Sequence, residues 1–147
     1  MKNLILLATV FLSLNVFAAE KNLPINEKVL KTFNQVFKDA QNVTWNSTDK
    51  YAEATFKSGD VKTKAFLDND GKLVQTIRYY QQENLPSNIL YNIQKKYSHE
   101  IWGVTEVSNS TGTVYNVVLK SSKHWYTVKA NSDGEVLLVS RLKRGDI

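Results

Sequence analysis

One stretch of this chain occurs twice, about 63 residues apart, and this duplication constrains the fold more than any other feature. Residues 50–77 read KYAEATFKSGDVKTKAFLDNDGKLVQTI, and residues 113–140 read TVYNVVLKSSKHWYTVKANSDGEVLLVS. They align without a gap, and Asp70-Gly71 falls on Asp133-Gly134. A period of this length indicates a duplicated supersecondary unit. The sequence therefore predicts two tandem repeats, over about 23–80 and 85–144.

Each repeat begins with the pattern of an amphipathic helix. In the first repeat, Leu23-Pro24 is expected to open the helix, because proline is tolerated at a first helical position. Apolar residues then recur every four positions, which places them on one helical face. The stripe comprises Ile25, Val29, Phe33 and Phe37 in the first repeat and Ile89, Ile93, Tyr97 and Ile101 in the second.

The rest of each repeat predicts four strands. Residues 51–57 and 61–67 alternate apolar and polar side chains, as half-buried strands do. The Asp-Gly pairs supply residues that accept positive φ in a hairpin turn. Strands joined by tight turns are antiparallel, and the helices are the available cover for one sheet face. The predicted fold class is α+β: two tandem α-β-β-β-β repeats sharing one antiparallel sheet of about eight strands, with both helices on one face.

The N-terminal segment has the features of a secretory signal peptide. Lys2 precedes an apolar run from Leu4 to Phe17, and Val16-Phe17-Ala18 provides a cleavage site. We expect cleavage after Ala18, which places the protein in the periplasm or outside the cell without a stable membrane anchor. An uncleaved anchor is the alternative. Residues 19–147 are expected to form a single domain, because the linker at 81–84 is too short for independent domains.

Composition narrows the partners of this chain. It contains no cysteine, so an exported chain of this size depends on a hydrophobic core rather than on disulfides. The formal net charge is +5, with the cations dispersed along the sequence. No run of lysine and arginine is interleaved with stacking aromatics on a recognisable nucleic-acid module. We therefore expect no nucleic-acid partner.

Four segments of the first repeat carry a resemblance to a known family. They are Leu23-Pro24, Val43-Thr44-Trp45, residues 51–56 and Asp68-Asn69-Asp70-Gly71. Together they resemble the PepSY-like domain family, which is similar to β-lactamase-inhibitor proteins built as tandem helix-plus-four-strand units. The second repeat departs from the pattern, since Glu106 is aligned with Trp45 there. The resemblance implies exported, non-catalytic proteins that bind or inhibit other proteins, and it identifies no contact residues.

No constellation in the sequence indicates catalysis or metal binding. An EF-hand reading of the loop at 68–71 fails, because Phe66 and Ile77 occupy positions that need acidic ligands. The two histidines, His99 and His124, lie in different repeats without a metal-ligand spacing. No nucleophile elbow is present. We expect no enzyme activity, no catalytic or metal-binding residues and no cofactor.

The alternation of the strands predicts a candidate binding surface. Val61, Ala65 and Leu67 supply the helix-facing side, so Phe66 and Trp125 are expected on the opposite face. Exposed aromatic residues beside lysines are typical of protein-binding surfaces. The predicted surface comprises Trp125, Phe66 and Tyr51 at its centre, ringed by Lys62, Lys64 and Lys129. A register slip or a dimer would hide these residues instead.

The sequence therefore predicts an exported, non-catalytic protein-binding module. Inhibition of a periplasmic or extracellular enzyme is one form that this function could take. The alternative is a small-ligand carrier or an enzyme that uses a pocket between the helices and the sheet. The identity of the protein partner and the oligomeric state are left open by the sequence.

Overall fold

The structure is a computed structural model that describes residues 24–145. The predicted signal peptide, residues 1–18, lies outside the described residues. The described part of the chain contains two α-helices, one 3₁₀-helix and eight strands. In chain order these are α1 (Glu27–Val36), β1 (Gln41–Ser47), β2 (Tyr51–Ser58), β3 (Val61–Asp68), β4 (Leu73–Tyr80), η1 (Gln82–Asn84), α2 (Ser87–Lys96), β5 (Glu100–Asn109), β6 (Gly112–Lys120), β7 (His124–Asn131) and β8 (Val136–Lys143).

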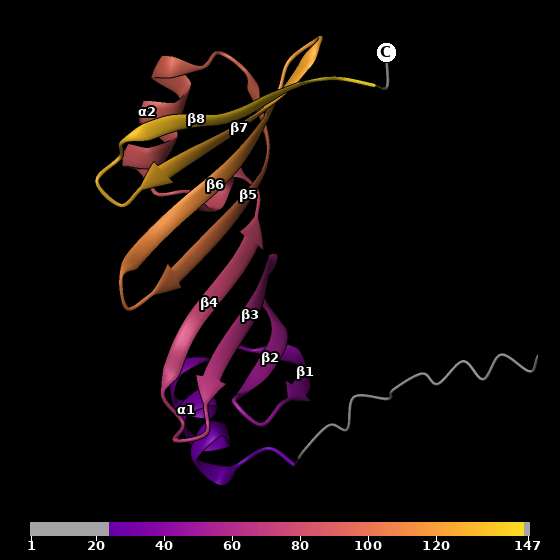
Figure 1. The fold of residues 1–147 in the computed structure, drawn as a ribbon, viewed down its shortest axis with the longest axis vertical. Helices are drawn as coiled ribbons and strands as arrows, with labels where there is room; N and C mark the ends of the chain where they lie inside the picture. The colour runs from indigo at the N-terminus through magenta and orange to yellow at the C-terminus, as the bar shows by residue number, and fades with distance from the viewer. Residues whose placement is uncertain (1–23, 146–147) are drawn as a thin grey trace, which may run out of the picture.

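The eight strands form one continuous sheet. Each strand pairs with its neighbours in the chain, so the spatial order runs from β1 to β8. Every pair is antiparallel, as expected for strands joined mostly by short turns. Figure 1 shows β1–β4 at one end of an elongated molecule and β5–β8 at the other. The predicted α+β class and the eight-stranded antiparallel sheet are confirmed.

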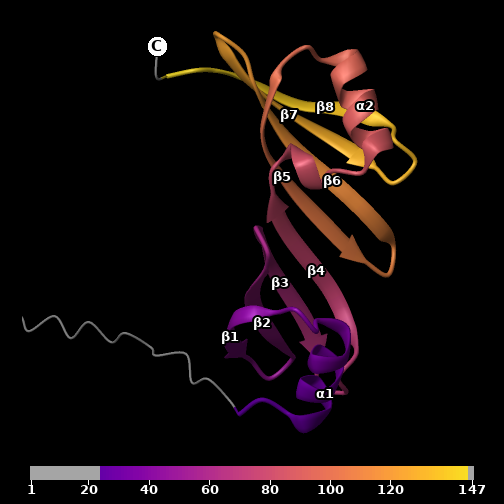
Figure 2. The same ribbon diagram turned by 180° about the vertical axis from the view of Figure 1, so that it is seen from behind.

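Both helices pack against the same face of this sheet, as Figure 2 shows. The helix α1 buries Val29 and Phe33, and α2 buries Ile89 and Ile93. These residues belong to the apolar stripes seen in the sequence. Since each helix has ten residues, a single stripe is enough to attach it to its end of the sheet.

The helix α1 begins later than the sequence suggested. Its first residue is Glu27, not Pro24, because Asn26 acts as the N-cap. The Asn26 side chain accepts a hydrogen bond from the backbone N–H of Lys28 at 2.9 Å. Asparagine is among the preferred N-cap residues because its side-chain oxygen satisfies an otherwise unpaired N–H of the first turn.

Two hydrophobic clusters lie beneath the helices. The first, under α1, is rich in aromatic rings. The centroid of the Phe33 ring lies 4.9 Å from that of Trp45 and 5.2 Å from that of Phe56, and both contacts are edge-on. The second, under α2, is largely aliphatic, and it includes Ile93, Leu119 and other side chains that are completely buried. Each end of the sheet therefore has a core of its own, although the sheet itself is continuous.

Glu106 does not occupy the place of Trp45, contrary to the sequence alignment. Trp45 pairs with Ala54, and Val104 pairs with Val117. Because Ala54 and Val117 are equivalent in the duplicated stretch, Val104 is the residue that matches Trp45. The alignment was wrong here because β5 has ten residues whereas β1 has seven.

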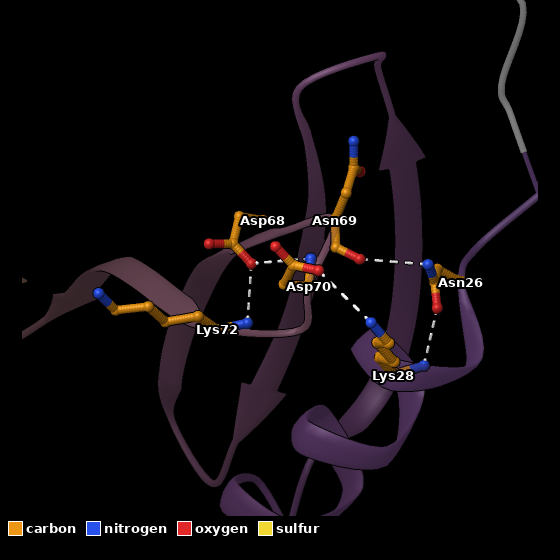
Figure 3. A network of polar contacts seen from close by, with 6 residues as sticks. All are labelled: Asn26, Lys28, Asp68, Asn69, Asp70 and Lys72. Carbon is orange, nitrogen blue, oxygen red and sulfur yellow. Dashed lines mark hydrogen bonds and ion pairs between the residues drawn. The ribbon is translucent and has the colours of Figure 1, made fainter.

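The turn after β3 is tied to the start of α1 (Figure 3). One Asp68 carboxylate oxygen accepts hydrogen bonds from the backbone N–H groups of Asp70, at 3.0 Å, and Lys72, at 2.9 Å. The Asn26 side-chain amide donates to the carbonyl oxygen of Asn69 at 3.2 Å. The predicted hairpin turn is confirmed, and its acidic side chain is used to hold the turn itself.

Candidate protein-binding surface

The sheet face opposite α1 and α2 is covered by no helix of residues 24–145, and we call it the open face. In β3, Ala65 and Leu67 are completely buried on the helix side. Their neighbours Lys64 and Phe66 therefore lie on the open face, as successive side chains of a strand point to opposite faces. By the same alternation, Trp125 lies on the open face of β7.

One group of the predicted surface residues gathers on the open face of β2 and β3. The Tyr51 and Phe66 rings meet edge-on, with their centroids 5.7 Å apart. Beside them, the Lys64 ammonium donates to the Glu53 carboxylate at 2.7 Å. This hydrogen bond and the charge of Glu53 raise the pKa of Lys64. We call Tyr51, Glu53, Lys64 and Phe66 the tyrosine group.

A second group lies on the open face of β5–β8 and is built around two indoles. Trp102 and Trp125 meet edge-on, with ring centroids 5.5 Å apart. The Lys120 ammonium lies 4.5 Å from the Trp102 ring centroid and 5.7 Å from that of Trp125. The Arg144 guanidinium lies 5.6 Å from the Trp125 centroid. We call these four residues the tryptophan group, in which cations and indoles attract one another through the ring quadrupoles.

The structure separates the residues that the sequence predicts at one centre. Phe66 pairs with Gln75, and Gln75 pairs with Asn109 at the C-terminal end of β5. Trp125 pairs with Lys120, whose partner is Glu100 at the N-terminal end of β5. These two ends are roughly 30 Å apart at the rise of a β-strand. Trp125 is therefore distant from Tyr51 and Phe66.

The predicted lysines are also distributed among these regions. Lys62 pairs with Lys57 and Tyr79 at the end of β3 away from Phe66. Lys64 belongs to the tyrosine group. Lys129 pairs with Asn116 and lies beyond the tryptophan group on β7. The six predicted residues thus lie on the open face but form no single cluster.

A groove lies between the two groups, where the chain passes from β4 to β5. It has a volume of about 650 Å³. Tyr79, Trp102, Thr105 and Val118 contribute its open-face wall, and residues of η1 and Asp60 border it. The groove therefore extends the tryptophan group toward the middle of the sheet.

Trp102 is the main residue that the sequence analysis missed. It is 52% exposed, and it lies where the pairing of β5 with β6 shifts register between Ile101 and Gly103. The sequence pattern predicts only a short strand from Val104 to Val107 here, which leaves Trp102 outside the strand. An irregular strand pairing produces no periodic pattern in the sequence. A tryptophan followed by a glycine at the start of a strand can nevertheless indicate such an irregularity.

Residues 24–145 contain no group of three or more histidine, cysteine or acidic side chains that could hold a metal ion. Within the same residues, no helix combines the length and the apolar character needed to cross a membrane.

Solved structures with the same fold come from several Bacteroides species. A BLIP-like protein from Bacteroides fragilis superposes with a TM-score of 0.64 at 16% identity, over 84% of this chain and 91% of that one. A DUF2874 family protein from Bacteroides ovatus gives 0.61 at 16% identity, over 83% and 89%. A protein from Bacteroides eggerthii, provisionally assigned to the periplasm, gives 0.60 at 15% identity, over 82% and 90%. No family model and no curated protein matches the sequence. The comparison shows a BLIP-like fold.

Proposed function

We propose that this protein is an exported, non-catalytic protein-binding module that engages its partner through the open face. The observation that carries the proposal is the tryptophan group, in which half-exposed Trp102 is held against Trp125 and Lys120. Large aromatic side chains with few rotatable bonds dominate the energetics of protein interfaces. A folded chain that keeps two indoles in place on its surface loses little conformational entropy when it binds.

The charge of the open face indicates the chemistry of the partner. Lys62, Lys129 and the tryptophan-group cations Lys120 and Arg144 give this face an excess of positive charge, while the charge of Glu53 is matched by Lys64. An acidic partner surface would steer toward this face and accept hydrogen bonds from its rim. An aromatic centre with a cationic rim is the arrangement of many protein interfaces.

The helix–sheet interfaces argue for surface binding over an internal pocket. Ile89, Ile93 and Leu119 are completely buried where α2 meets the sheet, and Phe33 fills the corresponding space under α1. Side chains occupy the positions where a carrier or enzyme would need a cavity. For this reason we favour the binding module over the small-ligand carrier or enzyme.

The same proposal includes the repeat architecture of the protein and its cellular location. We interpret the two helix-plus-four-strand segments as tandem repeats of the PepSY-like type, and residues 1–18 as a cleaved signal peptide. Binding would then occur in the periplasm or outside the cell, and inhibition of an enzyme there is one form of it. N-terminal mass spectrometry of the exported protein should find Ala19 first, and an intact Met1 would contradict export by cleavage.

Affinity capture from a periplasmic extract tests the binding function. The bait is used as wild type, as Trp102→Ala and as the control Tyr91→Ala, which removes an exposed ring from α2 on the opposite side of the sheet. We expect the wild type and the control to capture the same protein. Trp102→Ala should weaken its binding by about 2 kcal/mol or more if the indole is a hot spot.

The partner identified in this way then needs a direct measurement. Isothermal titration with the purified partner should show the same order of affinities, with both tryptophan variants, Trp102→Ala and Trp125→Ala, weaker than Tyr91→Ala. Equal affinity in all three variants would contradict the open face as the binding surface. Loss of affinity only in the Tyr91 variant would move the interface to the helix side.

A further inference from the structure

The edge strand β8 carries the most hydrophobic exposed segment of the described chain. Within residues 24–145, β8 pairs with β7 alone, so its outer edge has no strand beside it. The exposed large side chains of this strand are 50–65% accessible, and they are Leu137, Leu138, Val139 and Leu142. A long, apolar edge of this kind favours pairing with another strand.

The opposite edge of the sheet is different. The strand β1 presents the polar residues Gln41, Asn42, Thr44 and Asn46 to solvent. Its pairing with β2 shifts register between Gln41 and Thr44, and Asn42 has a φ of 54°. Polar side chains, here with a residue of positive φ among them, protect this edge from pairing. Of the two sheet edges within residues 24–145, only β8 therefore has the properties of an interface.

The β8 strand is self-complementary when two copies run antiparallel. If a two-fold axis passes between Val139 and Ser140, Leu137 of each copy lies opposite Leu142 of the other. The same register places Glu135, next to β8, opposite Arg144 of the second copy. Opposite charges and apolar pairs that face each other directly stabilise a sheet. A parallel arrangement would instead bring Arg141, Lys143 and Arg144 beside their own counterparts.

The faces of the side chains also agree in this register. Leu137 pairs with Lys129 and Leu142 pairs with Trp125, so both leucines lie on the open face. In a regular strand, two residues five positions apart would lie on opposite faces. Here the register of the β7–β8 pair shifts between Thr127 and Val128, and this shift returns Leu142 to the face of Leu137. Two further pairs, Leu138 with Arg141 and Val136 with Lys143, lie on the helix side. The irregularity in β8 therefore places Leu137 and Leu142 on the same face, as this antiparallel register requires.

We propose that two copies of this chain associate through antiparallel pairing of their β8 strands. The two sheets then continue into one, and the open faces of the two copies become continuous. Since the contact uses the same edge of both copies, it closes after two, and the protected β1 edges at the far ends prevent growth into a fibre. The interface is small, so we expect association in the micromolar range rather than a permanent dimer.

Sedimentation equilibrium of the purified protein is the first test. We expect the wild type to dimerise, with at least half of the chains paired at about 100 µM. Leu142→Glu should lower the association constant at least about ten-fold, because it places a carboxylate opposite Leu137. The control Tyr91→Glu changes an equally exposed residue on α2 and should dimerise like the wild type. A wild type that stays monomeric at about 100 µM, or an unaffected Leu142→Glu variant, would overturn the proposal.

Cysteine cross-linking tests the register and stays informative if Leu142→Glu does not fold. The chain has no cysteine of its own. The double variant Leu137→Cys/Leu142→Cys should form dimers under mild oxidation, and its two cysteines are roughly 16 Å apart within one chain, too far for an internal disulfide. The control Leu138→Cys/Leu142→Cys puts the thiols on opposite faces and should cross-link at least about ten-fold more slowly. Equal rates would overturn this register and the proposal with it.

Discussion

Arg78 and Glu106 face each other across the β4–β5 pair, and Nη1 of Arg78 lies 3.2 Å from both carboxylate oxygens of Glu106. The Tyr80 hydroxyl donates a further hydrogen bond to the same carboxylate at 2.6 Å. These residues lie on the helix side of the sheet where β4 meets β5, and Tyr80 belongs to the hydrophobic cluster under α2. A polar contact whose Tyr80–Glu106 part is buried thus holds the seam where the two halves of the sheet meet.

Removing the Glu106 carboxylate should destabilise the whole protein. Glu106→Ala leaves the buried Tyr80 hydroxyl without its acceptor, while the partly exposed Arg78 loses a counter-ion that water can replace, so we expect a loss of about 1–3 kcal/mol in the free energy of unfolding. Urea denaturation measures it. The control Glu100→Ala removes an exposed carboxylate from the same strand and should cost less than about 0.5 kcal/mol. Equal losses in both variants would contradict a structural role for the seam.

The stability of the protein should decline at alkaline pH because of Tyr80. Burial, together with the hydrogen bond to Glu106, raises the pKa of Tyr80 above the ordinary value of 10.0. The protonated phenol is therefore favoured by folding. The contribution of the protonated phenol to the free energy of unfolding is complete below pH 10.0. This contribution is lost as the pH rises above that value toward the folded-state pKa, since only the unfolded chain releases the proton there.

Urea denaturation between about pH 8 and about pH 11 checks this dependence. Tyr80→Phe has no phenol to titrate, so its free energy of unfolding should fall less steeply above pH 10.0 than that of the wild type. The control Tyr91→Phe changes an exposed tyrosine and should keep the wild-type slope. A wild-type slope in Tyr80→Phe would show that other groups cause the alkaline loss.

Two tryptophans provide a matched test of the core and the open face. Trp45 packs edge-on against Phe33 in the first cluster, so Trp45→Ala should lower the free energy of unfolding by about 3 kcal/mol. Trp102 is half exposed, and Trp102→Ala should cost no more than about 1 kcal/mol. Thermal and urea unfolding measure both. The reverse order would indicate that Trp102 is a core residue and would remove the basis of the binding surface.

Gly71 should tolerate substitution less well than Gly59, although both have positive φ. Gly71 has a φ of 81°, and a Cβ atom there would lie 2.6 Å from the backbone oxygen of Lys28 in α1. Gly59 has a φ of 57° and open space around it. We expect Gly59→Ala to cost about 1 kcal/mol from backbone strain alone. Gly71→Ala should cost about 2 kcal/mol or more, because the turn must also move away from the helix.

The strand faces were predictable from the sequence because they depend on local alternation. Residues 61–67 alternate in the sequence, and the structure buries Val61, Ala65 and Leu67 as that alternation requires. The turn at Asp70-Gly71 was equally local, since positive φ is a property of single residues. The helix start was not predicted correctly: the sequence pattern places it at Leu23-Pro24, whereas the Asn26 side chain caps a helix that begins at Glu27.

The grouping of the surface residues was decided only by the tertiary structure. Local alternation assigns Phe66 and Trp125 to a face, but their separation depends on the registers of the intervening strand pairs. Those registers shift at irregular points, and one such shift brings Trp102 beside Lys120 and Trp125. The sequence by itself determined the strands, the turns and the apolar faces, because neighbouring residues encode them. Which aromatic rings meet was determined by long-range pairing, which no local pattern records.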